Sequence, residues 1–431
     1  TRRPETSACA GAEQLLSGVW DAERKQALHA AFIATGSAVA ERQWQDVERT
    51  LDRYAADWVA RRTDVCAATG PRPELTDARL ACLDQRLENL RGWVGVFERA
   101  DARVIERAAE SARGRDDLQM CGDPAPALQP VPHDLDLRGR VLRLRGLLEA
   151  QRVRTRVGAH DAAFVALLGL QAAARSLGYA PLECEVVDAL AYNHQARDRY
   201  DDAIAYYRRA GELAEEARYD IMRARTWTGL AYVFDFLYRY DESETAARYA
   251  EAVLKPMAGR QVETERLRIE LVGALNVWGR GKREEAATLM RRLLVGFERH
   301  HGGDSFELAT LLFEDGGLLV ELGRLEEADA AFTLAETIVR EVGGETHPML
   351  AKILGERGNL AFKRGDYATA LAQQRRSLAL KLRRAPPDSL TIGIVRANLG
   401  QALLRLNRPD EALAELGAAR AIMARTLGPK N

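Results

Sequence analysis

The 431-residue chain has few aromatic residues, almost no net charge and no long apolar run. Aromatic residues make up 6% of it, and 62 basic residues balance 63 acidic ones to a formal net charge of −1. This balance argues against a nucleic-acid partner, because domains that bind nucleic acid are usually basic. No apolar run reaches the roughly 18 residues of a transmembrane helix, and no cleavable signal peptide stands at the start. We therefore expect membrane attachment, if there is any, through a segment outside this chain.

Motifs that carry catalysis are also missing. The chain has no G-x-G-x-x-G or Walker loop, no H-R-D or D-F-G of a kinase and no G-x-S-x-G elbow. Its seven His are scattered, and no two have the i, i+4 spacing of a metal-binding helix face. We predict no catalytic residue, no cofactor site and no metal site. Only an active site assembled from distant repeats stays open.

Strand signals are nearly absent, while Ala, Leu, Arg and Glu, which favour helices, dominate the composition. The sequence therefore predicts an all-α fold. From Cys184 to Leu427 the chain repeats itself, and small residues in the middle of successive helical patterns mark six repeats at spacings of 40, 43, 42, 42 and 42 residues. These small residues are Ala191, Ala231, Ala274, Gly316, Gly358 and Gly400.

A second small residue follows each of these after twelve positions, and the chain breaks between the two. The second set is Ala203, Ser243, Ala286, Ala328, Ala370 and Ala412. Breaks are predicted at 198–200, 238–240, 281–283, 323–325, 365–367 and 407–409. Each repeat therefore reads as two close antiparallel helices. Such a hairpin has two apolar sides and cannot bury both alone, so stacked repeats form a solenoid.

Residues 9–121 have helical periodicity without the repeat, and we expect a small helical bundle there after a tail at 1–8. Helices are predicted at 21–34, 38–68, 75–100 and 101–112, with Asp21 as the first cap. A Pro-rich linker at 122–135 follows. The solenoid then spans 136–431, with one degenerate repeat before the six. For the seven Arg of its first helix, at 135–157, we favour a solvated face over a phosphate- or lipid-binding one.

Four of the six Trp lie in the amino-terminal region, at Trp20, Trp44, Trp58 and Trp93. They could line a ligand pocket, but we favour a core that is filled by large aromatic side chains.

Four of the five Cys also lie there. A hairpin turn at 70–73 brings Cys66 and Cys82 near each other, so a disulfide between them is predicted, and Cys9 and Cys121 bracket the region and can join its ends. Free thiols are the alternative, and a metal site is disfavoured because no C-x-x-C pair exists. Cys184 reads as a core residue.

The repeats resemble the tetratricopeptide repeat family, in its longer kinesin-light-chain form. The matching residues in one repeat are Gly358, Ala361, Gly365, Tyr367, Ala370 and Leu371, and those in another are Gly316, Leu319, Gly323, Ala328, Phe332 and Ala335. The resemblance implies a right-handed solenoid that binds a protein or peptide on its concave face.

Family geometry also implies which positions face the concave side. It selects Tyr192, Gln195, Arg225, Tyr232, Asp235, Arg268, Trp278, Lys352, Asn359, Phe362, Lys363, Gln401 and Arg405. Cations outnumber acids in this set, which would suit an acidic segment or a carboxyl terminus. Alternatively, several of these residues are merely exposed or pack between repeats.

Residues 9–121 are similar to the segment that follows the kinase domain and membrane helix in tetratricopeptide-containing serine/threonine protein kinases of myxobacteria. The similarity is carried by Cys9, Gly18-Val19-Trp20-Asp21, Trp44, Trp58, Cys66 and Arg79-Leu80-Ala81-Cys82-Leu83, among others. It implies a sensor region on the extracytoplasmic side of a membrane-anchored kinase, where disulfides persist. The alternatives are a self-assembling scaffold, with the possibility of homo-oligomers, and a cytoplasmic regulatory protein unrelated to a kinase.

Overall fold

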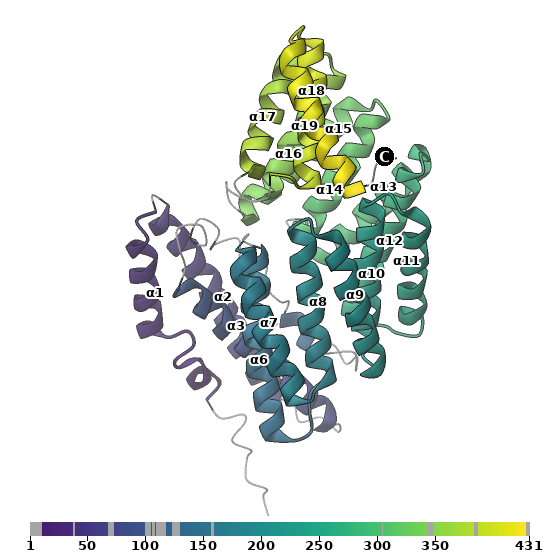
Figure 1. The fold of residues 1–431 in the computed structure, drawn as a ribbon. Helices are drawn as coiled ribbons and strands as arrows, with labels where there is room; N and C mark the ends of the chain where they lie inside the picture. Colours follow the sequence, from purple (N-terminus) through teal and green to yellow (C-terminus); the bar gives the residue numbers. More distant parts are fainter. Residues whose placement is uncertain are drawn as a thin grey trace, which may run out of the picture. The chain divides into compact units, whose positions relative to one another are not determined.

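The computed structural model describes residues 11–37, 39–67, 73–99, 105, 108, 118–122, 130–156, 159–303, 305–343, 348–382 and 387–427. Every regular element in these residues is helical, which confirms the predicted all-α fold. Figure 1 shows the helices arranged mostly as antiparallel neighbours along the chain.

The amino-terminal region forms long helices close to where they were predicted. They are α1 (Ala22–Ala34), α2 (Ala40–Ala67) and α3 (Pro73–Phe97), with short 3-10 helices η2 (Ala12–Leu16) and η3 (Leu118–Gly122). The predicted cap is confirmed, because the Asp21 carboxylate accepts a hydrogen bond from the backbone N–H of Arg24 at 2.9 Å. The helix predicted at 101–112 lies largely outside the described residues.

The four Trp of this region fill its core, as favoured above. Trp58 and Trp93 are 0% and 1% exposed, and all four belong to one cluster with Phe32, Phe97 and aliphatic neighbours. The Trp58 indole N–H donates to the backbone oxygen of Leu83 at 2.8 Å, so its only polar atom is satisfied inside the core. These side chains are occupied by packing and leave no ring free for a ligand.

The predicted Cys66–Cys82 disulfide is wrong. Cys82 pairs with Cys121, with a Cα–Cα distance of 5.5 Å. The antiparallel register explains why, because Trp58 bonds to Leu83, which places Cys66 about seven residues, or about 10 Å, from the level of Cys82. A disulfide cannot bridge that offset. Cys66 is itself disulfide-bonded, and Cys9 lies outside the described residues.

Antiparallel helix pairs follow from residue 135 to residue 427. The bounds are α6 (Leu135–Arg156), α7 (His160–Leu177), α8 (Ala180–Ala196), α9 (Tyr200–Glu216), α10 (Asp220–Phe236), α11 (Tyr240–Leu254), α12 (Arg260–Gly279), α13 (Arg283–His301), α14 (Phe306–Glu321), α15 (Leu325–Gly343), α16 (Pro348–Lys363), α17 (Tyr367–Leu382), α18 (Leu390–Arg405) and α19 (Pro409–Leu427). From α8 onward, each predicted repeat is one such pair.

All six predicted breaks are turns that contain one residue with a positive φ. These residues are Asp198, Tyr238, Gly281, Gly323, Gly365 and Asn407, with φ between 57° and 83°. The left-handed conformation ends the first helix and reverses the chain. Three of the six residues are not glycine, and a positive φ is sterically unfavourable for them. Packing of the hairpin therefore offsets the local strain of these turns.

The paired small residues allow the two helices of a repeat to touch. The Ser243 hydroxyl donates to the backbone oxygen of Ala231 at 2.7 Å across one hairpin. In the last repeat, a Cβ added at Gly400 would lie 2.5 Å from Leu416 Cγ and 3.4 Å from the Ala412 oxygen. The predicted role of these positions in close helix approach is thus confirmed in the second and the last repeat.

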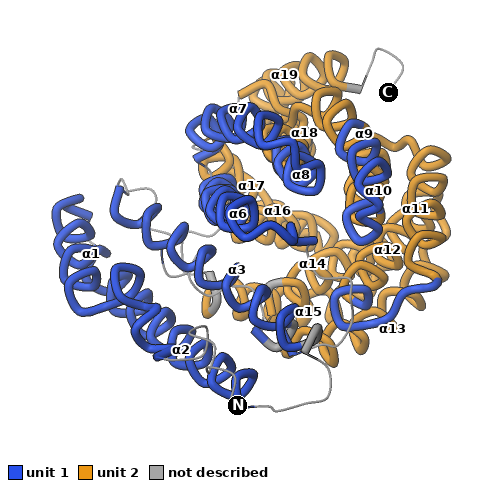
Figure 2. The backbone as a smooth tube through the Cα atoms, turned by 90° about the horizontal axis from the view of Figure 1, so that it is seen from below, with its two compact units in different colours: residues 1–190, 209–223, 256–263 blue, residues 191–208, 224–255, 264–431 orange. Residues whose placement is uncertain are grey.

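The chain divides into two compact units (Figure 2). The first comprises residues 1–190, 209–223 and 256–263, and the second comprises residues 191–208, 224–255 and 264–431. Within the first unit, α3 packs directly on α6. A Cβ at Gly92 would collide with the backbone oxygen of Gly146, and a Cβ at Gly146 would lie 2.6 Å from the Glu88 oxygen. The bundle helix and the first helix after the linker therefore cross with their backbones in contact.

Helix α6 does not have the wholly solvated arginine face that the sequence suggested. Arg145 is buried and makes two hydrogen bonds with Glu185 of α8, at 2.9 and 2.7 Å, and a third with the Pro130 oxygen at 2.8 Å. Both side chains of the ion pair are at most 2% exposed. The linker end, α6 and α8 are thereby held to one another through a single guanidinium group.

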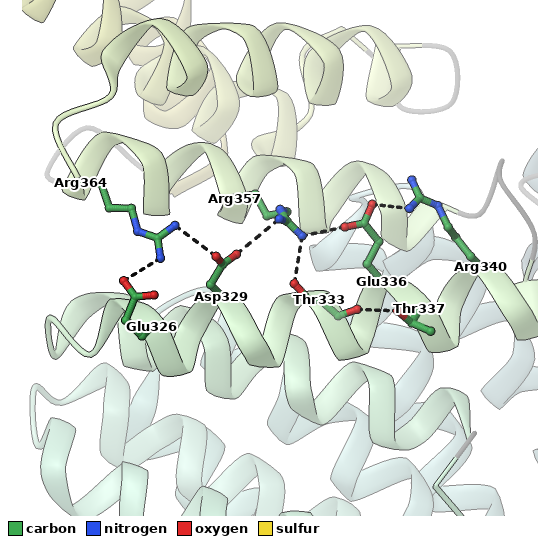
Figure 3. A network of polar contacts seen from close by, with 8 residues as sticks. All are labelled: Glu326, Asp329, Thr333, Glu336, Thr337, Arg340, Arg357 and Arg364. Carbon is green, nitrogen blue, oxygen red and sulfur yellow. Dashed lines mark hydrogen bonds and ion pairs between the residues drawn. The ribbon is translucent and has the colours of Figure 1, made fainter.

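Neighbouring repeats of the second unit are also joined by ion pairs at their edges. Arg357 of α16 reaches Glu336 at 2.9 Å and Asp329 at 3.4 Å on α15. About two turns further along, Arg364 reaches Glu326 at 3.0 Å and Asp329 at 3.2 Å. Figure 3 shows these contacts as one row along two helices. Partly exposed pairs of this kind contribute only about 0–1 kcal/mol each, so the row fixes the register of the helices more than it stabilises them.

We predict that Glu185→Ala destabilises the first unit by about 3–5 kcal/mol, because it leaves the Arg145 charge buried without its partner. Chemical denaturation followed by circular dichroism measures this change. The matched control is Glu212→Ala, which removes an exposed partner of Arg209 that lies 2.9 Å away, and it should cost less than about 1 kcal/mol. Equal effects of the two substitutions would contradict the structural role given to the buried pair.

The disulfide makes a second prediction. Proteolysis without reductant should release one linked peptide pair that contains Cys82 and Cys121, and mass spectrometry identifies it. The variant Cys82→Ser should lose about 4 kcal/mol in the chain-entropy model, because the bridge spans 39 residues. A linked pair that contains Cys66 and Cys82 would overturn the assignment.

Candidate functional site

The first helices of successive repeats lie against one another in the second unit. Helix α14 contacts α16, and α16 contacts α18, in addition to the contacts within each hairpin. Helices in direct contact form the shorter, inner layer of a curved array, so the side chains that they turn away from the second helices define its inner wall. The thirteen predicted binding residues were placed on these same first helices.

Side chains from four successive first helices meet on this wall. Tyr232 and Asp235 come from α10, Trp278 from α12, Glu314 from α14, and Lys352 and Glu356 from α16. We call these six residues the inner-wall cluster. Gly317 marks its centre, because a Cβ there would lie 3.1 Å from Trp278 Cη2 and 4.0 Å from Glu356 Oε2. The indole ring and the carboxylate therefore meet over a position that has no side chain.

Two carboxylates of the cluster are held in an unfavourable environment. Burial raises the pKa of Asp235 to about 7. Burial also raises the pKa of Glu314 to about 7, where Lys352 lowers it and the Glu356 and Asp235 carboxylates raise it further. Asp235 Oδ1 is buried and makes no hydrogen bond. Such groups gain stability from a partner that brings a hydrogen-bond donor or a positive charge.

A second group of contacts continues the cluster towards α17. Burial raises the pKa of Glu356, and the carboxylate accepts a hydrogen bond from the Asn359 amide at 3.1 Å. Gln374 of α17 donates to Asn359 at 2.8 Å. Burial lowers the pKa of Lys381, at the end of α17, to about 8 despite the nearby Glu356 carboxylate. The wall therefore carries charges of both signs in a partly desolvated setting, and not the mainly basic groove that the sequence suggested.

Two of the five basic residues predicted for the groove, Arg268 and Arg405, are engaged within the chain. Arg268 bonds to Glu265 on its own helix at 2.8 Å. Arg405 donates to the Tyr367 hydroxyl and lies over the rings of Tyr367 and Phe362, 4.5 and 5.8 Å from their centroids. These three residues join α16, α17 and α18, which is the alternative of packing between repeats.

The remaining predicted residues are spread more widely. Gln195 accepts a hydrogen bond from the Tyr207 hydroxyl at 2.9 Å inside its hairpin. Tyr192 is 44% exposed and lies close enough to Tyr232 to influence the ionisation of its hydroxyl. Lys363 and Gln401 are exposed, and Arg225 is half-buried. The structure thus brings Tyr192, Tyr232, Asp235, Trp278, Lys352 and Asn359 together and leaves the others apart.

Sequence reasoning missed Glu314, Glu356 and Lys381. Glu314 and Glu356 each stand two positions before the small mid-helix residue of their repeat, whereas Gly229 and Val272 occupy that position in two earlier repeats. Because those earlier repeats have a small or apolar residue at this position, an acidic residue does not recur there in every repeat. A comparison of Glu314 with Glu356 alone would have revealed the pattern, because both repeats have an acid at the same phase.

Two general searches bear on other kinds of site. Among the residues that the structure describes, no group of three His, Cys, Asp or Glu side chains is placed to hold a metal ion. None of the described helices is both long and apolar enough to cross a bilayer.

The raised pKa values predict how stability depends on pH. The folded state binds protons on Asp235 and Glu314 more tightly than the unfolded chain, so unfolding free energy should fall as pH rises from about 4 to 7. Asp235→Asn removes part of this dependence and should be more stable than the parent at pH 8 but not at pH 4. Denaturation at the two pH values measures this, with the exposed Asp201→Asn as control. A variant that tracks the parent at both pH values would refute the burial of this carboxylate.

Comparisons with known proteins address the repeats and the fold. A tetratricopeptide repeat model matches residues 307–383, and a second tetratricopeptide repeat model matches residues 395–431. A search of curated protein sequences gives no significant match.

Several solved structures are similar to this chain at low sequence identity. A Rap protein complexed with Competence and Sporulation Factor is 15% identical, with a TM-score of 0.52 over 82% of this chain and 99% of that chain. Aspartyl phosphate phosphatase F from Bacillus subtilis is 10% identical, with a TM-score of 0.48 over 95% and 96% of the two chains. BtubC from P. vanneervenii is 19% identical, with a TM-score of 0.40 over 53% and 92%. Identities this low concern the fold alone, and of these three only the Rap structure exceeds a TM-score of 0.5.

The helical hairpins, the turns with positive φ and the small-residue contacts agree with the two matched segments. The chain therefore contains tetratricopeptide repeats at residues 307–383 and 395–431.

Proposed function

We propose that this protein is a sensor or scaffold that binds a peptide or protein segment along the inner wall of its second unit. The observation that carries the proposal is the inner-wall cluster, where aromatic and ionisable side chains from four successive repeats gather without full pairing of their charges. Buried aromatic anchors with polar neighbours are the usual core of a protein interface. An extended segment can contact all four repeats at once.

The similar fold of a protein that was solved together with another molecule supports this proposal. The Rap protein with a TM-score of 0.52 was solved in complex with Competence and Sporulation Factor. A helical array of this kind can therefore hold another molecule, and we extend that property to the present chain. The charge pattern of the wall, with Asp235 unpaired, favours a partner that is not purely acidic.

We also propose that the chain is the non-catalytic sensor region of a receptor-type serine/threonine kinase and lies on the extracytoplasmic side of a membrane. The support is the resemblance of residues 9–121 to such kinases, together with the Cys82–Cys121 bridge, since disulfides persist in oxidising compartments. The reading frame upstream of Thr1 tests this proposal. We expect H-R-D and D-F-G motifs followed by a membrane helix in that upstream sequence. Their absence would contradict the proposal that the chain is part of a kinase.

The self-assembling scaffold is the weaker candidate. Two apolar side chains of the last helix point inward, because Leu416 Cγ lies 2.5 Å from a Cβ added at Gly400, and Ile422 Cγ2 lies 3.0 Å from one added at Gly393. Leu413 is exposed at 74%. One exposed leucine offers little apolar area for end-to-end stacking.

Peptide selection tests binding along the wall. The full chain is immobilised and a library of random linear peptides is selected against it. Trp278→Ala and Lys352→Glu should each weaken the selected peptides by roughly tenfold or more, as expected for anchor residues. Fluorescence anisotropy measures the affinity, and circular dichroism should show the parent helicity.

The matched control is Lys282→Glu, a charge reversal at an exposed lysine in the turn between the two helices of one repeat, where it pairs with Glu285 at 3.4 Å. It should leave affinity unchanged. If the control weakens binding as much as Lys352→Glu does, long-range charge and not the wall explains the result. If neither wall variant weakens binding, the wall is not the site.

A further inference from the structure

The two ends of the repeat array in the second unit touch each other. The Thr391 hydroxyl, in the first turn of α18, donates to Asp198 Oδ2 at 3.0 Å, across 193 residues of sequence. Asp198 stands in the turn between α8 and α9. Both residues belong to the second unit, so this contact lies within one compact body.

Asp198 is held in place from its own side of the contact. It has a positive φ of 58°, and the Tyr200 hydroxyl donates to its Oδ1 at 2.6 Å. One carboxylate oxygen is thus used within the first repeat, and the other faces the last. On the opposite side, the Ser389 and Thr391 hydroxyls are 3.2 Å apart at the start of α18. Among the described residues, the polar part of the contact is therefore one hydrogen bond between two locally fixed groups.

Apolar side chains complete the contact. Leu390 is 2% exposed and belongs to one cluster with Tyr200 and Phe234 of the first two repeats. Ile394 of α18 and Met423 of α19 pack partly buried against the same cluster. The last repeat thus reaches the first through a hydrogen bond and three apolar side chains, whereas neighbouring repeats share a continuous buried core.

A row of helices whose ends meet encloses its inner wall. The inner-wall cluster and Lys381 lie on the helices between the two ends, and the Asp198 carboxylate is near enough to Lys381 to affect its charge. A polypeptide can then reach the wall only along the axis of the array, unless the ends part. Among the described residues this junction consists of one hydrogen bond and the side chains of Leu390, Ile394 and Met423, whereas the core from α12 to α16 is continuous. The junction of the ends should therefore open first.

We propose that the contact of Asp198 with Thr391, backed by Leu390, is a latch that closes the second unit around its inner wall and opens to admit a polypeptide. The partner rests on the function proposed above, but the opening and closing of the latch do not. The latch is a two-state element, and a partner that binds only the open array shifts the balance between the states.

The test locks the latch with a second disulfide. In the variant Asp198→Cys with Thr391→Cys, oxidation joins the ends covalently. The probe is an amine-reactive ester attached to a long polyethylene glycol chain, and mass spectrometry measures its reaction at Lys352 and Lys381. Lys352 is exposed to water in the closed array, so the reagent has to be of polymer size for closure to exclude it. We take the open state to be populated to at most about 10% and to be the state that admits the reagent. Because locking removes this state, it should slow both reactions by about tenfold or more relative to the unlocked form. Lys255 and Lys282, which are exposed away from the wall cluster, serve as internal references and should react equally in both forms.

The opposite variant, Thr391→Val, removes the hydroxyl with little change of shape and should speed both reactions. The Thr391→Cys single variant under the same oxidation controls for the treatment. Equal rates at Lys352 and Lys381 in the locked and unlocked forms would overturn the latch, and so would failure of the two cysteines to join. These results are independent of the peptide selection. If locking slows the reactions but no peptide binds the wall, only the proposed function is contradicted. If a peptide binds the locked form as fast as the unlocked form, only the latch is contradicted.

Discussion

The fold depends on one steric condition, which is that the two helices of each repeat approach within backbone contact. Small residues at two fixed positions, twelve apart, recur in every repeat from Ala191 to Ala412 and leave room for this approach. Where the first of them is glycine, as at Gly316, an added Cβ would lie 2.5 Å from Phe332. A larger side chain would force the hairpin apart, and the apolar sides of neighbouring hairpins would then no longer match. Solenoid stability is a sum over such interfaces, so one widened hairpin weakens two of them.

The sequence was sufficient for most of the second unit, because the same local rules recur there six times. The turns at Gly323 and Asn407 could not each be predicted with certainty from their own residues. They could be predicted because each stands at the same place between the two small residues of its repeat. Candidate residues on the wall were partly predictable for the same reason. Trp278 and Asp235 follow the phase of the repeat, while Glu314 and Glu356 use a phase that is polar in only some repeats.

The amino-terminal region shows why the rest could not be predicted. Its helices follow from periodicity, but the Cys82–Cys121 pairing depends on how η3 packs against α3, and no repeated pattern in the sequence indicates that packing. The burial of Arg145 had no signal either, since its partner Glu185 lies 40 residues away on another helix. Long-range partners of single residues are set by packing, and a single sequence gives no second copy from which to infer them.

The contact between Asp198 and Thr391 also bears on how such a protein can change its length. An open solenoid can gain or lose a whole repeat, since each unit meets only its neighbours. Here the turn of the first repeat must find the start of the last one, so the arc between them has to contain a fixed number of units. Duplication of one 42-residue unit would move α18 away from Asp198. The turn of the first repeat and the start of α18 would then no longer contact each other. The contact between the two ends therefore fixes the number of repeats that the array can contain.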